Sequence, residues 1–321
     1  MKCSLGKRVY GAAIRALLAH PPSAGHRTPR GQRPVFPGED CREEDLEEQI
    51  NGEIETTMNL ELENKKALVT GSTAGIGFAI ASRLAREGAE VWVNGRTPER
   101  VEKAILEIEK HFPDARLHGI AADLGSAAGC SEVVRQLPKV DVLINNLGIF
   151  EPKAFEKISD AEWEKFFAVN VLSGVRLSRA YLAGMKARNW GRIIFISSES
   201  ALQIPAEMIH YGTTKTAQLA VARGLAETCA GSNVTVNSVL PGPTASEGVT
   251  EFVGQLAQQN QVTPEEFENY FFRHARPTSL LQRFIEPNEI ANVVAFISSP
   301  LASAINGASV RADGGVIKSI A

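Results

Sequence analysis

The sequence predicts an α/β fold: a doubly wound parallel sheet with helices on both faces and a small helical lid over the substrate. From Lys66 onward, short apolar runs alternate with amphipathic helical stretches. A glycine-rich turn, TGSTAGIG at residues 70–77, joins the first apolar run to the first helical stretch. Later apolar runs end in polar residues, as expected where parallel strands end at one ligand-binding edge of a sheet. Such a sheet is called Rossmann-like.

Bulk composition sets limits on function. The chain has 321 residues, of which 44% are hydrophobic and 22% charged, as in an ordinary globular protein with a substantial core. The net charge of −3 gives no electrostatic argument for nucleic acid or an anionic membrane. No apolar run approaches the roughly 18–20 residues that span a bilayer. Four scattered cysteines, without a CxxC pair, indicate neither a metal site nor a disulfide framework, and they fit a cytoplasmic location.

Residues 1–57 differ from the rest of the chain. Residues 1–38 hold seven Lys or Arg and no acid, whereas residues 39–55 hold nine acids and one Arg. Such charge blocks are typical of a disordered extension. An organellar transit peptide, a functional disordered arm and untranslated sequence before a true start at Met58 all fit, and we favour the third. We expect residues 1–57 to be dispensable for fold and turnover, and residues 58–321 to form one domain.

Strands are predicted wherever a short apolar run is bounded by turn residues. These runs lie at residues 66–70, 90–94, 115–123, 140–146, 191–198, 233–242 and 308–312. Helices are predicted where apolar residues recur on one face, as at Ile76, Ile80 and Leu84, with Gly88 as a stop. The predicted helices cover residues 75–88, 98–111, 127–136, 160–188, 210–230 and 287–298.

The glycine turn indicates a dinucleotide site. Glycines at this position allow a tight turn, a close backbone approach to a pyrophosphate and tight packing of the following helix. The helix amides then face the anion with the positive end of the helix dipole. We predict cofactor contacts at Gly71, Ser72, Thr73, Gly75, Ile76 and Gly77.

The end of the second strand favours NADP(H) over NAD(H), although NAD(H) stays possible. An NAD site commonly places a carboxylate there to accept from the ribose 2′-hydroxyl. Here residues 94–96 are Asn, Gly and Arg. A guanidinium can bind a 2′-phosphate, so we predict that Arg96 does so. The alternative is that Arg96 is a solvated residue before the Thr97 helix cap.

Two further strand ends supply candidate cofactor contacts. Asp123 and Leu124 follow the third strand, and Asn145 and Gly148 follow the fourth. Asp123 is expected either to contact the adenine or to cap the next helix. The asparagine and glycine lie at the edge where open α/β sheets bind ligands.

A hydroxyl, a phenol and an ammonium fall on the same edge. Ser198 ends the fifth strand, and Tyr211 precedes Lys215 by one helical turn. An ammonium and an oxidised nicotinamide ring favour the phenolate and lower its pKa, so that Tyr211 can exchange a proton with a carbonyl or hydroxyl. Ser198 is expected to donate to the substrate oxygen, and Lys215 to hold the nicotinamide ribose as well. Asn170 is expected to hold a water linked to Lys215.

Over about 65–315, the chain resembles the short-chain dehydrogenases/reductases, in their compact single-domain form. The resemblance rests on the order and spacing of TGSTAGIG, NNLG, Asn170, Ser198, YGTTK and PGP (241–243). The resemblance implies catalytic roles for Asn170, Ser198, Tyr211 and Lys215. It also implies cofactor contacts at Pro241, Gly242 and Thr244, and a homodimer or homotetramer.

The predicted activity is interconversion of a small-molecule carbonyl and a secondary alcohol with NADP(H). Residues 245–283 are predicted to cover the substrate, and the aromatics at 252, 267, 270, 271 and 272 form either the core of that lid or an apolar substrate pocket. One rival is 3-oxoacyl-carrier-protein reduction, which a basic patch of Arg176, Arg179, Arg273 and Arg276 would favour. The other is a protein that senses NADP(H) without turnover.

Overall fold

The chain divides into two units, Met1–Thr57 and Met58–Ala321. The computed structural model describes residues 58–247, 249 and 263–320, all of them in the second unit. The predictions for residues 1–57 and for Phe252 lie outside the described residues.

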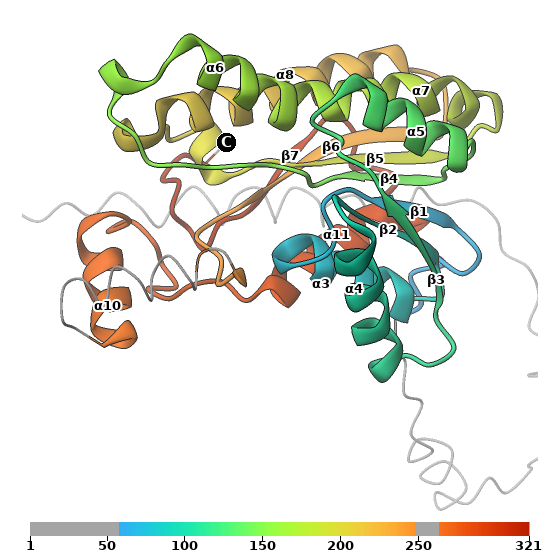
Figure 1. Ribbon diagram of the computed structural model, residues 1–321, viewed down its shortest axis with the longest axis horizontal. Coiled ribbons are helices and arrows are strands. Elements are labelled where there is room, and N and C mark those ends of the chain that lie inside the picture. Colours follow the sequence, from blue (N-terminus) through green and yellow to red (C-terminus); the bar gives the residue numbers. More distant parts are fainter. Residues whose placement is uncertain (1–57, 248, 250–262, 321) are drawn as a thin grey trace, which may run out of the picture. The chain divides into compact units, whose positions relative to one another are not determined.

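A seven-stranded, fully parallel sheet forms the centre of the second unit (Figure 1), with the strand order β3-β2-β1-β4-β5-β6-β7. The order reverses between β1 and β4, as in a doubly wound sheet, so the predicted fold class is confirmed. The strands are β1 (Lys66–Val69), β2 (Glu90–Gly95), β3 (Arg116–Ala121), β4 (Val142–Asn145), β5 (Gly191–Ile196), β6 (Val234–Pro241) and β7 (Ser309–Ala312).

Helices cover both faces of the sheet (Figure 1). One face carries α3 (Gly75–Arg86), α4 (Pro98–His111) and α11 (Pro287–Ser298). The other carries α5 (Ala127–Gln136), α6 (Asp160–Phe167), α7 (Ser173–Ala187) and α8 (Ile209–Thr228). Helix α10 (Pro264–His274) stands apart from both layers, within the predicted lid. None of the helices in the described ranges is long and apolar enough to cross a membrane.

The core consists of two layers because alternate residues of each strand point to opposite faces. Val69 and Ile144 pack with Ile80 of α3 on one face. Leu68 and Leu143 pack with Met185 of α7 on the other. The inner strands are therefore buried on both sides, which explains their continuous apolar runs, whereas the edge strands β3 and β7 are largely exposed.

The helix predicted over 160–188 is interrupted. Residues Ala168–Leu172 form a π-helical turn between α6 and α7. Asn170 lies in this turn, and its side chain makes hydrogen bonds to the backbone of Ile149. The wider turn thus lets a helical residue reach the loop that follows β4, a geometry common at functional sites.

The loops at the strand-order reversal are tied together by side chains. The Thr70 hydroxyl accepts hydrogen bonds from the amides of Asn146 and Leu147, each at 2.9 Å. The Asn146 side chain donates in return to the carbonyls of Thr70 and Gly71, at 2.9 and 3.0 Å. These four bonds fix the glycine turn against the end of β4.

Asn94 fixes the same turn from the other side. Its side-chain oxygen accepts from the Gly71 amide at 3.1 Å, and its nitrogen donates to the carbonyls of Ile120 and Ala122, at 3.1 and 3.3 Å. The residue is buried, so water cannot replace these partners.

We expect Asn94→Ala to lower the free energy of unfolding by about 1–3 kcal/mol, because buried backbone groups lose their partners. NADPH affinity should fall as well, since the Gly71 turn is no longer held. Chemical denaturation and fluorescence titration with NADPH measure the two effects. Asn59→Ala, at an exposed asparagine, is the matched control. Equal stability of the two variants would contradict the structural role of Asn94.

Candidate active site

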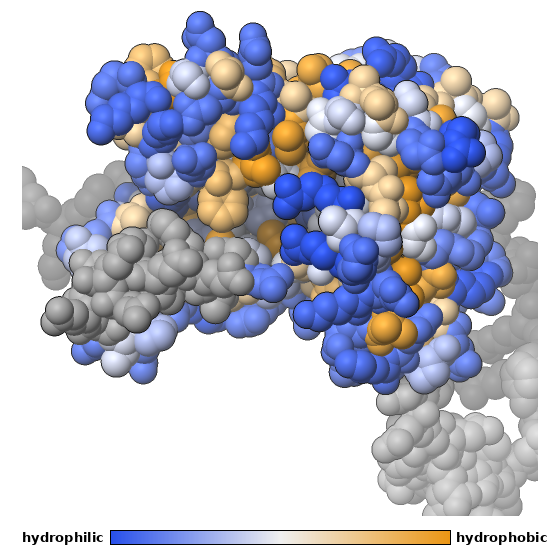
Figure 2. All heavy atoms as spheres, viewed as in Figure 1, coloured by the Kyte–Doolittle hydropathy of each residue, from blue (hydrophilic) through white to orange (hydrophobic). Residues whose placement is uncertain are grey.

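A pocket of about 440 Å³ opens at the carboxyl edge of the sheet. Figure 2 shows hydrophobic side chains inside a hollow on this face, with hydrophilic residues around it. Ile196 and Ser198 reach the pocket from β5 and the turn after it, Gly148 from the loop after β4, and Tyr211 and Lys215 from α8. The predicted catalytic residues at the strand end and on the helix therefore meet in one cavity.

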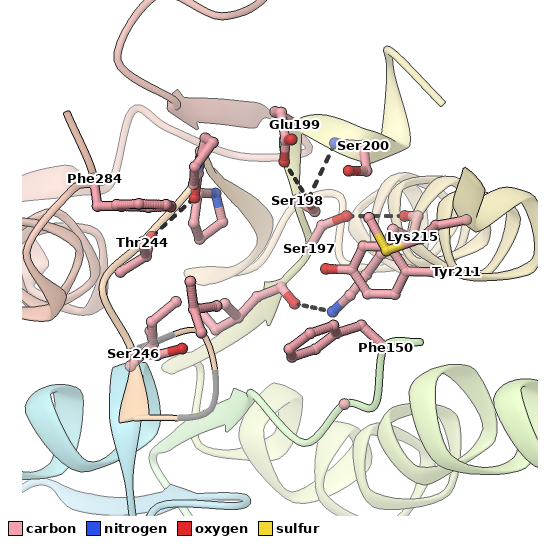
Figure 3. Close-up of a pocket in the computed structure, with 18 of the residues that line it drawn as sticks. Phe150, Ser197, Ser198, Glu199, Ser200, Tyr211, Lys215, Thr244, Ser246 and Phe284 are labelled. Atoms are coloured by element: carbon pink, nitrogen blue, oxygen red, sulfur yellow. Dashed lines mark hydrogen bonds between the residues drawn. The ribbon is translucent and has the colours of Figure 1, made fainter. Parts of the chain in front are cut away.

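Local hydrogen bonds hold Ser198 and Tyr211 in place (Figure 3). The Ser198 side chain caps a short 3-10 turn (Glu199–Ala201) by accepting from the Ser200 amide at 3.1 Å. Ser197 donates to the backbone carbonyl of Lys215 at 2.9 Å, which fastens α8 to the end of β5. Tyr211 lies in the first turn of α8, with the Phe150 ring edge-on to its ring at 6.3 Å between centroids.

Lys215 is a buried lysine, only 4% exposed. Its ammonium donates to the Ile196 carbonyl at 2.8 Å and lies 5.7 Å from the centroid of the Tyr211 ring. A second, longer contact joins it to the side-chain oxygen of Gln218 at 3.5 Å. Burial lowers the pKa of Lys215 to about 7. The amine can therefore change its charge near neutral pH.

The pKa of Tyr211 differs from the sequence-based expectation. Burial raises it well above its ordinary value, and the negative charge of Glu199 raises it further. A hydrogen bond with Ser198 and the positive charge of Arg276 oppose this rise, with smaller effects. The expected lowering included an oxidised nicotinamide ring, whereas the protein groups alone favour the neutral phenol.

Asn170 holds the loop after β4 rather than offering a free amide. Its side-chain nitrogen donates to the Ile149 carbonyl and to the Thr214 hydroxyl, both at 3.0 Å. Its side-chain oxygen accepts from the Ile149 amide at 2.8 Å. Both amide hydrogens are thus engaged by protein groups, and the water link between Asn170 and Lys215 stays a prediction.

The glycine turn has the geometry that a pyrophosphate needs. Gly71 and Gly75 have φ values of +60° and +56°, in the left-handed region that favours glycine. A β-carbon at Gly77 would lie 2.4 Å from the Gly71 carbonyl oxygen, so only glycine fits there. Within the described ranges, no side chain caps the start of α3 at Ala74. The first amides of α3 are therefore free to bind an anion, and the turn fits a dinucleotide.

Two predicted contacts in this region have their side chains turned inward. The Ser72 hydroxyl donates to the Val69 carbonyl at 2.7 Å and accepts from the Asn94 amide at 2.9 Å. Asn145 is buried and donates to Ser178 at 3.2 Å, whereas the next residue, Asn146, lines the pocket. Thr73 and Ile76 are partly exposed, and Ile76 also lines the pocket.

The residues predicted to read the adenosine end lie at the ends of β2 and β3. Arg96 is exposed, and within the described residues no acidic side chain forms an ion pair with it. Asp123 is also exposed, and its carboxylate accepts from the Gly125 amide at 3.0 Å. Asp123 thus helps to shape the turn before α5, while Ser126 is the helix cap. Leu124 is buried.

The segment after β6 forms another wall of the pocket. Pro241, Gly242 and Thr244 all line it. The Thr244 hydroxyl donates to the Gly242 carbonyl at 2.9 Å, and Thr244 pairs with Ile285 in a short parallel bridge. This bridge ties the wall to the chain that returns from α10.

Both interpretations of the lid aromatics hold in part. Phe267 and Phe271 of α10 line the pocket together with Phe284, and the rings of Phe271 and Phe284 stack at 5.2 Å. Phe272 is buried and packs edge-on against Phe271 at 5.1 Å. Tyr270 is exposed. The pocket wall opposite the sheet edge is therefore aromatic.

Sequence reasoning missed a buried ion pair in the pocket. The side chain of Arg276 meets Glu199 with 3.0 Å between Nε and Oε1, and both residues line the cavity. Arg276 was a candidate for a basic patch at the mouth, but it is buried and paired. Arg176 and Arg179 lie on α7, away from the pocket lining, and Arg273 is exposed. The sequence analysis did not single out Glu199, and nothing in the sequence indicated that it pairs with Arg276.

Comparison with known proteins agrees with this geometry. The family model described as short chain dehydrogenase matches residues 65–256. The Bacillus subtilis (strain 168) protein called uncharacterized oxidoreductase YvaG is 52% identical over 263 residues, covering 82% of this chain and all of that protein. The 3-oxoacyl-acyl-carrier-protein reductase FabG of Aquifex aeolicus (strain VF5) is 32% identical over 263 residues, covering 81% of this chain and all of that protein.

A solved structure also matches. L-sorbose reductase from Gluconobacter frateurii, complexed with NADPH and L-sorbose, has a TM-score of 0.76 and 28% identity, covering 82% of this chain and all of that one. The family match covers more than half of the chain, and its residues include the glycine turn, Ser198, Tyr211 and Lys215. The chain belongs to the short-chain dehydrogenase family and is an NAD(P)-dependent oxidoreductase.

Proposed function

We propose that the protein reduces a small-molecule ketone to a secondary alcohol with NADPH, and catalyses the reverse reaction with NADP⁺. The observation that carries this proposal is the meeting of Ser198, Tyr211 and the buried Lys215 at one end of an apolar pocket. A protein that only senses the nucleotide has no need of this arrangement.

Tyr211 is the proton donor for reduction in this proposal. Its raised pKa keeps the phenol protonated at neutral pH, which is the form that can give a proton to a carbonyl oxygen. Ser198 lies beside it and can donate to the same oxygen when its hydroxyl hydrogen rotates away from Glu199. Bound NADP(H) would supply or accept the hydride. Lys215 would bind the nicotinamide ribose and favour the phenolate once the proton has left.

The preference for NADP(H) rests on Arg96. Its exposed guanidinium stands at the carboxyl end of β2, where the ribose 2′-position is read in this type of sheet. The glycine turn and the uncapped start of α3 would hold the pyrophosphate. The NADPH complex of the related L-sorbose reductase supports the same preference.

The walls of the pocket favour a ketone with a sizeable apolar part. Phe150, Phe267, Phe271, Phe284 and Met208 face the cavity. Apolar walls with a few convergent polar groups are typical of small-molecule sites. Acyl-carrier-protein docking gains no support from Arg276, which is buried.

We further propose that the protein is a cytoplasmic homodimer or homotetramer. The family resemblance supports the assembly, and the scattered cysteines fit a reducing compartment. Light scattering on the purified full chain measures the assembly directly, and a monomer at micromolar concentration would contradict it.

Tyr211→Phe should lower kcat for ketone reduction by roughly 10²–10⁴-fold, because it removes only the acid that protonates the substrate oxygen. NADPH affinity and circular dichroism should stay unchanged. Tyr270→Phe, at an exposed tyrosine of α10, is the control and should keep full activity. Assays use NADPH consumption with a panel of aryl and alkyl ketones. Normal turnover by a folded Tyr211→Phe protein would refute the proposed mechanism.

Arg96→Asp should reduce the preference for NADPH over NADH by roughly tenfold to a hundredfold, because a charge-assisted hydrogen bond to the 2′-phosphate becomes a repulsion. The measured quantity is the ratio of kcat/KM for the two cofactors. Arg86→Asp, at the far end of α3, should leave the ratio unchanged. An unaltered ratio in Arg96→Asp would show that another group selects the cofactor.

Lys215→Met should stabilise the protein while weakening NADPH binding. The folded-state pKa of about 7 lies below the ordinary lysine pKa of 10.5, so burial of the ammonium opposes folding fully below pH 7. This penalty disappears as pH rises from about 7 toward the unfolded pKa. The Tm advantage of Lys215→Met should therefore be largest below pH 7 and shrink above it. A Tm difference that does not vary with pH would contradict the lowered pKa.

A further inference from the structure

The ion pair between Glu199 and Arg276 joins two distant parts of the site. Glu199 directly follows Ser198, whereas Arg276 follows α10, 77 positions later. Their side chains are only 6% and 11% exposed. Arg276 also donates to the carbonyl of Ala275 at 2.9 Å, and its guanidinium carbon lies 5.9 Å from the centroid of the Phe271 ring. The segment that carries the aromatic wall is thus attached to the residue beside the catalytic serine.

The Glu199 carboxylate uses its two oxygens for two different partners. One oxygen, Oε1, accepts from Arg276. The other, Oε2, accepts from the Ser198 hydroxyl (Figure 3). The Ser198 oxygen in turn accepts from the Ser200 amide at 3.1 Å. A chain of hydrogen bonds therefore runs from Arg276 through Glu199 to the hydroxyl next to Tyr211. Charge-assisted hydrogen bonds of this kind fix geometry more strongly than neutral ones.

Stability alone does not explain a buried pair of this kind, because removing two charges from water offsets much of their attraction. Both residues line the pocket. Their charges also act on Tyr211 in opposite directions: the carboxylate favours the protonated phenol, and the guanidinium favours the phenolate. The pair thus places two opposing charges beside the group that exchanges the proton, and the carboxylate has the larger effect.

We propose that Glu199 and Arg276 are positioning residues of the active site, which hold the Ser198 hydroxyl beside Tyr211 and set the charge balance in which Tyr211 gains and loses its proton. This inference rests on the proposed function. Among the described residues, the other charged groups that line the pocket with Tyr211 are Lys215, on the same helix, and Glu207 of the 3-10 turn Ala206–Met208. The Glu207 side chain is 55% exposed and lies 3.8 Å from Arg276. Lys215 and Glu207 keep their own side chains in every variant of the test.

The test is a phenolate titration of the full chain with saturating NADP⁺. The chain has four tyrosines, so the Tyr211 signal is the near-ultraviolet difference between each protein and its Tyr211→Phe counterpart. Glu199→Gln keeps an oxygen that accepts from Ser198 but loses the charge, and should lower the Tyr211 midpoint by roughly one pH unit. Arg276→Met should raise the midpoint, because the carboxylate then acts alone. The double variant should fall between the two single variants.

The predicted order of the Tyr211 midpoints distinguishes a positioning role of Glu199 and Arg276 from a purely structural one. Loss of packing would lower activity in both single variants without moving the midpoints in opposite directions. Arg283→Met and Glu289→Gln are controls, because they remove charges from an exposed ion pair that joins the chain after α10 to the start of α11. Both should leave the Tyr211 midpoint unchanged. If Arg276→Met does not fold, the double variant still decides, since its midpoint must lie above that of Glu199→Gln.

Equal midpoints in wild type, Glu199→Gln and the double variant would overturn the inference and leave the proposed function intact. Full ketone reduction by Tyr211→Phe would overturn the proposed function itself, whatever the midpoints show.

A kinetic readout complements the titration. Glu199→Leu, which removes the acceptor for Ser198, should lower kcat at least tenfold more than Glu199→Gln, and equal kcat values would show that Glu199 does not hold the hydroxyl.

Discussion

The burial of one ammonium group is the constraint on which this site depends. Lys215 is buried at the end of β5, where its ammonium donates to the Ile196 carbonyl. Space is needed as well: a β-carbon at Gly148 would lie 3.3 Å from the Lys215 nitrogen. Ser197 donates a hydrogen bond to the Lys215 carbonyl and so holds helix α8 against the end of β5. Tyr211 is placed one turn earlier by the same helix.

The surrounding loops hold this arrangement through side chains that bind backbone groups. The Asn170 side chain forms hydrogen bonds with both the amide and the carbonyl of Ile149, and so fixes the backbone next to Gly148. Thr70 and Asn146 bind backbone groups of each other's loops, at the ends of the neighbouring strands β1 and β4, and so hold the glycine turn. Thr70 and Asn146 directly follow strands β1 and β4, and Asn170 binds the loop after β4. Ladder bonding stops at these strand ends, so backbone groups need other partners there. Rigidity at the cofactor edge therefore comes from polar side chains, while the sheet below is held by apolar packing.

The strands, the glycine turn and the grouping of Ser198, Tyr211 and Lys215 could be predicted because each depends on a local sequence pattern. The apolar runs located all seven strands, since strands of a doubly covered sheet are apolar on both faces. Ser198 at a strand end, and Tyr211 one turn before Lys215, needed only the periodicity of strand and helix to be placed together. The glycine turn was equally local, because left-handed φ values and a close backbone approach demand glycine at fixed positions.

Other features depend on contacts that no local pattern contains. The pairing of Glu199 with Arg276 joins residues 77 positions apart, so sequence patterns alone suggested a surface position for Arg276. Asn145 and Asn146 are adjacent and chemically identical, and only the pleat of β4 decides which one faces the pocket. The π-helical turn at Asn170 follows from its bonds to Ile149, which lies in another part of the chain. The pKa of Tyr211 rises because burial and the Glu199 charge outweigh the Ser198 hydrogen bond and the Arg276 charge, a balance that requires the three-dimensional environment.

The proposed chemistry requires this pocket to bring a carbonyl carbon and a nicotinamide together for direct hydride transfer. The most direct test follows deuterium from NADPH that is labelled at C4 of the nicotinamide. The purified protein is incubated with the labelled cofactor and the ketone panel, and the products are analysed by mass spectrometry and NMR. We expect one deuterium on the carbinol carbon of an alcohol product. Tight NADPH binding without deuterium transfer to any ketone of the panel would contradict direct hydride transfer and favour a nucleotide-sensing role.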